Sequence, residues 1–124
     1  MKKTVLLFNF DENRLPLVKR AVMPLKTGIK VVDKKDFNQV LGYLAEIPGF
    51  QMIIEGEAEE TFDDEMLVMA GFARKDIDEL IRSLKKHGAG RVDLKAILTP
   101  TNSLWDCVRL YKAVKADHEE MHKR

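Results

Sequence analysis

Two short runs of β-forming residues constrain the fold of this 124-residue chain more than any other feature. The first run spans residues 4–10 and the second spans residues 66–69. Their side chains are apolar almost throughout instead of alternating with polar ones, a pattern typical of strands that are buried on both faces. Helices must cover both faces of such a sheet, so the two runs predict an α/β fold.

Each run is followed by an amphipathic segment with helical periodicity and then by a shorter, less apolar strand. These shorter strands are predicted at residues 29–32 and 92–96. We place them at the edges, which gives the strand order 2-1-3-4 in a mainly parallel sheet whose two central strands run in the same direction. Right-handed crossovers then put the two crossover helices on opposite faces. A ferredoxin-like α+β arrangement is the alternative.

The two halves of the chain resemble each other. The first strand aligns with residues 67–72, and the apolar stripes of the helices that follow then fall on equivalent positions. This alignment predicts one domain, residues 1–124, made of two duplicated βαβα units at about 1–48 and 65–124 with an acidic loop at 49–65 between them. Chance similarity between two amphipathic patterns is the alternative.

The region between the two units carries three local predictions. Asp36 and Gln39 resemble a capping box, which predicts a helix that begins there and is ended by Pro48-Gly49. Residues 50–54 favour a short edge strand. The acidic loop contains seven carboxylates and no lysine or arginine, so we expect it to be the most mobile internal segment.

Charge and composition exclude several classes of protein. The chain has 33% charged residues and a net charge of +1, and its basic residues are scattered with few aromatic side chains among them, so nucleic-acid binding is not favoured. No apolar run approaches the length of a membrane span, and the short run near the N-terminus does not resemble a signal peptide. The single cysteine, Cys107, fits a reducing compartment, and a cytoplasmic protein is expected.

A ligand site is predicted at the carboxyl ends of the central strands, where the chain reverses direction in the predicted topology. The turn at residues 99–103 is predicted to cap the last helix, and such a helix N-terminus with Lys95 nearby could hold a small anion. A cap with no ligand is the alternative reading of this turn. The candidate ligand-binding residues are Asn9, Asp11, Gly71, Lys95, Thr99, Thr101, Asn102 and Trp105.

Trp105 is singled out because it lies off the apolar stripe of the last helix, which predicts a contact surface and allows a homodimer. The last helix also carries His118-Glu-Glu-Met-His122, which has the spacing of a zinc hydrolase motif. A catalytic zinc needs a third protein ligand, and the pattern equally fits a solvated helix end. We therefore predict no catalytic residues, no metal and no cofactor, with His118 and His122 as the weak metal candidates.

Several of these motifs together resemble a bacterial family of small proteins described as domain of unknown function 3783. The resemblance is carried by residues 66–72 and 94–102, together with Trp105 and Glu119, and the opening strand fits the pattern too. Ala73 departs from it, because a helix-capping serine is common there in the family. The family has no established activity, so the resemblance implies no mechanism.

Besides a structural homodimer that uses Trp105 and an edge strand, two classes of function remain from the sequence. The first is a non-enzymatic domain that binds a protein partner or a small anion, since the chain has a polar turn and an off-stripe tryptophan but no complete catalytic set. The second is a small enzyme that uses an anion or metal site, either at the histidine pair or with Asp11 and Lys95 as acid–base groups.

Overall fold

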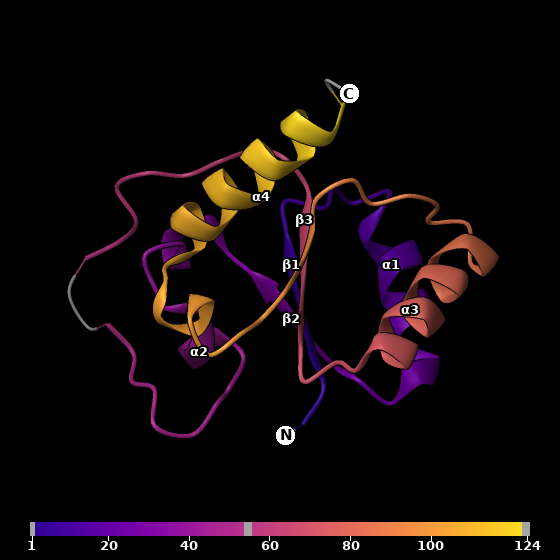
Figure 1. Cartoon of the computed structure of the whole chain (residues 1–124), viewed down its shortest axis with the longest axis horizontal. Coiled ribbons are helices and arrows are strands. Elements are labelled where there is room, and N and C mark those ends of the chain that lie inside the picture. The colour runs from indigo at the N-terminus through magenta and orange to yellow at the C-terminus, as the bar shows by residue number, and fades with distance from the viewer. Residues whose placement is uncertain (1, 54–55, 123–124) are drawn as a thin grey trace.

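The computed structural model describes residues 2–53 and 56–122, and its four strands form one sheet in the order β2-β1-β3-β4, as predicted (Figure 1). The strands are β1 (Thr4–Phe8), β2 (Gly28–Val32), β3 (Met66–Ala70) and β4 (Lys95–Ile97). The α-helices are α1 (Leu15–Val22), α2 (Leu41–Leu44), α3 (Arg74–Lys86) and α4 (Cys107–His122), and the 3₁₀ helices are η1 (Met23–Leu25), η2 (Lys34–Asp36) and η3 (Asn102–Leu104).

The burial of the strands follows the sequence pattern. All five residues of β1 and all five of β3 are buried, because these strands have neighbours on both sides and helices on both faces. The outer strands β2 and β4 keep several residues exposed or half-buried, as expected of edges. The α/β fold class and the strand order are therefore confirmed.

The direction of the central strands differs from the prediction. β1 pairs in parallel with β2, and β3 pairs in parallel with β4, but β1 and β3 are antiparallel with Leu7 opposite Leu67. The helix predicted to begin at Asp36 and to end at Pro48-Gly49 would have carried the chain back along the sheet. Instead, η2 and the single turn of α2 are too short to span it, at about 1.5 Å per helical residue.

The connection between β2 and β3 consequently begins and ends at the same end of the strands, the end at which β1 finishes. It leaves after Val32 and returns at Met66, and these two residues lie on either side of Phe8. In between it makes an isolated bridge between Val40 and Asp106 beside α4. The strand predicted at residues 50–54 is absent from described residues 50–53, and Ile54 lies outside the described residues.

The antiparallel pairing also moves the crossover helices. Two crossovers of the same hand, in units that run in opposite directions, place their helices on the same face of the sheet. α1 and α3 accordingly pack together on one face, over Val5, Leu7, Leu67 and Met69, so the prediction of opposite faces was wrong. The other face is covered by α2, α4 and the irregular connection, so the sheet still has helices on both faces (Figure 1).

An aromatic cluster holds the acidic segment against this second face. Phe62 is buried and stacks on Tyr111 of α4 with 4.1 Å between ring centroids, and on Phe37 with 4.6 Å. Described residues 56–65 thus have no regular secondary structure but are anchored to the core. Their mobility stays a prediction, and so does the internal duplication. None of the described helices combines the length and apolar character that crossing a bilayer requires.

We expect Leu7→Ala to lower the free energy of unfolding by about 2–5 kcal/mol, because it removes buried methyl groups and leaves a cavity between the central strands and α1 and α3. Leu7 is 1% exposed, whereas Val31 on the neighbouring edge strand is 45% exposed. The control Val31→Ala should cost less than about 1 kcal/mol. Urea unfolding of both variants measures the difference, and equal losses would contradict the strand order.

Candidate functional site

The structure divides the predicted ligand residues between opposite ends of the sheet. Because β1 and β3 are antiparallel, Asn9 and Asp11 follow the end of β1 beside the start of β3, whereas Gly71 follows β3 at the other end. Lys95 lies with the first group, opposite Leu67. The turn at 99–103 lies with Gly71, since β4 runs parallel to β3. The predicted crevice, with all of these residues around it, is therefore not formed.

Asn9 and Asp11 are both engaged within the protein. The Asn9 amide donates to the backbone oxygens of Phe62 (2.8 Å) and Asp64 (3.1 Å), and so ties the end of β1 to the acidic segment. The Asp11 carboxylate accepts from the backbone N–H groups of Asn13 (2.9 Å) and Arg14 (2.8 Å) at the start of α1. The backbone also requires a glycine at position 71, because φ is +75° and a Cβ there would lie 3.0 Å from the Lys2 backbone oxygen.

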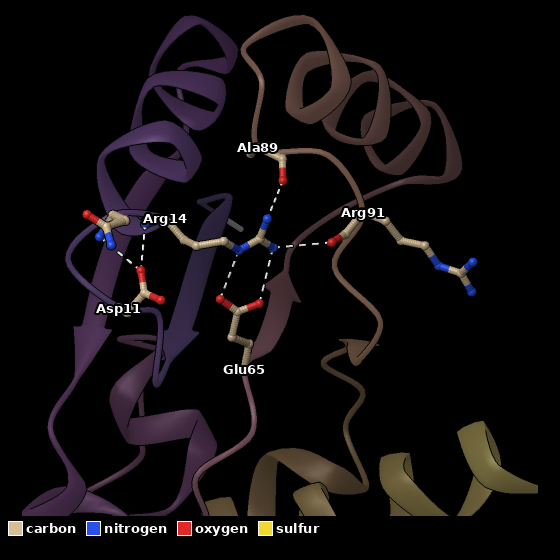
Figure 2. Close-up of polar contacts among 6 residues, drawn as sticks. Asp11, Arg14, Glu65, Ala89 and Arg91 are labelled. Carbon is tan, nitrogen blue, oxygen red and sulfur yellow. Dashed lines mark hydrogen bonds and ion pairs between the residues drawn. The ribbon is translucent and has the colours of Figure 1, made fainter.

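Arg14 is the centre of this end of the sheet, and sequence reasoning missed it. Figure 2 shows its guanidinium facing Glu65 and two backbone oxygens. Nε and Nη2 donate to the two Glu65 carboxylate oxygens at 2.9 and 3.1 Å, in the bidentate geometry that favours arginine. Nη1 donates to the Ala89 oxygen, and Nη2 also donates to the Arg91 oxygen at 3.2 Å.

The Arg14 contacts join three segments that are distant in sequence. They are the start of α1, the residue before β3 and the loop between α3 and β4. A cation at a helix N-terminus is repelled by the positive end of the helix dipole. The position of Arg14 at the start of α1 was therefore the one local signal in the sequence that it has a partner elsewhere in the fold. Its donors are used almost completely inside the protein, which makes Arg14 a structural link and leaves little for a ligand.

Asp64 forms a second polar link, between the acidic segment and α4. Its Oδ2 accepts from the Tyr111 hydroxyl (2.6 Å) and from Lys115 Nζ (3.0 Å). The Tyr111 hydrogen bond, followed by that of Lys115, lowers the pKa of Asp64 below its ordinary value. The same Asp64 hydrogen bond raises the pKa of Tyr111. Lys112 with Glu60 (2.8 Å) and Lys34 with Asp63 are further ion pairs of this segment.

The turn at residues 99–103 closes on itself and does not cap the last helix. Thr99 Oγ1 accepts from Asn102 N (3.1 Å), and Asn102 Oδ1 accepts from Thr99 N (2.7 Å). Thr101 precedes the short η3 and makes no side-chain cap bond there. α4 starts only at Cys107, where Asp106 accepts from Arg109 N at 2.9 Å. The prediction that this turn caps the last helix was therefore wrong, and anion binding by the turn stays a prediction.

The remaining candidates lie apart from one another. Trp105 is half-buried against the core, with the Arg109 guanidinium 4.4 Å from its ring centroid. The ring centroids of His118 and His122 lie 4.1 Å apart on α4. No cluster of three metal-ligating side chains occurs in the described parts of the chain. Cys107 is fully buried, which raises the pKa of its thiol well above the usual range.

Lys95 borders an apolar groove between α3 and the approach to β4. The groove has a volume of about 340 Å³ and is lined by Ile81, Leu84, Lys85, Gly90, Arg91, Val92 and Lys95. The Lys95 ammonium donates to the Val92 oxygen, and burial followed by repulsion from Arg91 lowers its pKa. Ile81 is 46% exposed and Ile97, on the same face of β4 as Lys95, is 43% exposed. Lys95 was predicted from the sequence as a candidate ligand residue, but this groove was not predicted.

Residues 65–121 match the sequence model of a protein family described as a domain of unknown function, DUF3783. The family resemblance is confirmed for this segment. The match to DUF3783 covers β3, α3, β4 and α4 up to Met121, and so includes Glu65, the groove and Trp105. Arg14 and the opening strand lie outside the residues matched to DUF3783. No curated protein and no solved structure matches the chain.

We expect Arg14→Lys to lower the free energy of unfolding by about 1–3 kcal/mol, because one ammonium cannot replace both bonds to Glu65 and those to two backbone oxygens. The control Arg20→Lys alters an exposed arginine on the same helix and should change stability by less than about 0.5 kcal/mol. Chemical unfolding measures both. Similar values for the two variants would show that the Arg14 contacts do not stabilise the fold.

We also expect the stabilisation by Tyr111 to depend on pH. The pKa of Asp64 is lowered on folding, so its hydrogen bonds stabilise the protein above the ordinary value of 3.8 and are lost as pH falls through the folded value. The difference in unfolding free energy between wild type and Tyr111→Phe should thus be constant at about pH 5–7 and shrink on acidification. Tyr43→Phe is the control, and a Tyr111 effect that is the same at every pH would exclude the Asp64 link.

Proposed function

We propose that this protein is a non-enzymatic interaction domain, which binds another protein at the groove between α3 and β4. The single observation that carries the proposal is this apolar groove, whose lining residue Ile81 is 46% exposed. Large apolar side chains exposed together on one surface are typical of sites that a partner covers. We expect the domain to act in the reducing cytoplasm, since it has one buried free cysteine.

The way the fold covers its sheet supports this site. α1 and α3 both lie on one face, and they pack against each other over the two central strands. On that face Ile97 of β4, beside Met69, is 43% exposed. In the described residues no strand pairs with the outer edge of β4. A partner that covers this surface would complete the packing that α3 begins.

The polar groups favour binding over catalysis. Asp11, which the enzyme hypothesis uses as an acid–base group, accepts two backbone hydrogen bonds, and Arg14 and Glu65 bond each other. Lys95 lies on the other side of β3 from β1 and donates to a backbone oxygen. An acid–base pair must reach one reacting atom together, and these groups have separate structural partners.

A displayed library of random peptides tests this proposal. Peptides selected on the wild-type protein should bind Ile81→Asp at least about tenfold more weakly, because the charge enters the apolar centre of the surface. They should bind Met23→Asp as tightly as wild type, since Met23 is 68% exposed but lies in η1, outside the groove lining. Far-ultraviolet circular dichroism checks both folds. Selected peptides that bind Ile81→Asp without loss would exclude the groove as the interaction site.

A further inference from the structure

The groove beside β4 has a charge pattern that specifies its partner further. Its floor consists of Ile81, Leu84 and Val92, of which Leu84 and Val92 are buried and Ile81 is partly open to solvent. Its rim carries the cations Lys85, Arg91 and Lys95, and the described lining includes no carboxylate. A ligand that fits must therefore present apolar side chains to the floor and negative charge to the rim.

The rim cations retain capacity for a partner. Arg91 forms its ion pair with Asp93 at 2.9 Å, but both side chains are highly exposed, so this pair is weak and readily replaced. Lys85 is exposed at the end of α3. Lys95 is half-buried, and its desolvated ammonium interacts more strongly with a carboxylate than a fully hydrated one does.

The backbone of β4 specifies the shape of the partner. Leu94 O and Leu98 N bond to β3, at 2.9 Å from Leu67 N and 2.8 Å from Met69 O. Since backbone groups alternate along a parallel strand, the N–H and C=O of Lys95 and the N–H of Ile97 point away from β3. Ile97 O accepts from the Asn102 amide at 3.1 Å, which marks where pairing along this edge would stop. The available edge suits a short extended segment.

We propose that the partner segment is an acidic peptide with large apolar side chains, bound in an extended conformation along β4 with its apolar side chains in the groove. This inference rests on the proposed function and names the partner class for the same site. Carboxylates flanking the apolar side chains would meet Lys85, Arg91 and Lys95, so that every part of the site has a complement.

A second copy of the chain is a poorer complement. Two copies paired through β4 would bring Lys95 and Arg91 of each copy towards those of the other, and like charges facing each other destabilise strand pairing. The acidic loop of a second copy, residues 49–65, contains two aromatic residues, Phe50 and Phe62, and the Phe50 ring packs against Gly42. However, Phe62 is only 6% exposed and stacks within its own aromatic cluster, so it is not available to fill the groove of a neighbour.

Two matched peptide arrays test the inference. One array holds peptides about six residues long that alternate Glu or Asp with Leu, Ile or Phe, and the other replaces every acid by Lys. Fluorescence polarisation should show at least about tenfold tighter binding to the acidic array, with affinity falling as salt rises. The double variant Lys85→Glu/Lys95→Glu should reverse the preference. The control Lys19→Glu/Lys30→Glu changes the same charge on α1 and β2 and should leave it unaltered.

Each contrary outcome has a distinct meaning. Equal binding of the two arrays, lost in Ile81→Asp, would overturn the acidic preference but keep the groove as the interaction site. Binding of the acidic array that Ile81→Asp does not weaken would refute both the inference and the proposed function. No binding to either array would overturn the inference, and self-association lost in the double variant would identify a second copy as the partner instead.

Discussion

The antiparallel pairing of β1 with β3 is the constraint on which the rest of this structure depends. It brings the end of β1 to the start of β3, so that Asn9, Arg14 and Glu65 lie at the same end of the central strands. It also places α1 and α3 on one face, where they pack against each other. The other face is then left to α4 and to an irregular connection that must be held in place by side chains.

Side chains hold that connection in place without regular secondary structure. Phe62 enters the aromatic cluster, and Asn9 binds the backbone on both sides of Asp63. Asp64 then contacts Tyr111 and Lys115 on α4. The dense acidic charge of this segment is thus matched by lysines on η2 and α4, which reduces the self-repulsion that its sequence alone suggests.

The sequence contained enough information for the strands and their order but not for their directions. Residues 5–8 and 66–70 are apolar throughout, which identifies central strands, and the more polar 28–32 and 95–97 identify edges. A fully apolar run looks the same in both directions, however. The direction of β3 depended on how residues 33–65 cross the other face, and this path is set by tertiary contacts such as the bridge between Val40 and Asp106.

The candidate site was harder to predict from the sequence than the strands, because it too depends on the directions of the central strands. Asn9, Asp11 and Lys95 were recognised as polar residues at strand ends, but their neighbours changed when the central strands became antiparallel. Arg14 and Glu65 are separated by 51 residues, and no local pattern connects them. The groove depends on how far α3 extends over β4, which is a property of helix packing that no single segment encodes.

Cys107 gives the second face of the sheet a chemical property of its own. Its thiol is fully buried at the first turn of α4, lies 3.8 Å from the Gln39 backbone oxygen, and has a raised pKa. A thiol-modifying reagent reacts with the thiolate, so the folded protein resists it. Modification then requires α4 to separate from the residues that cover the thiol. The rate of labelling therefore reports how often this face opens, independently of the groove on the other side.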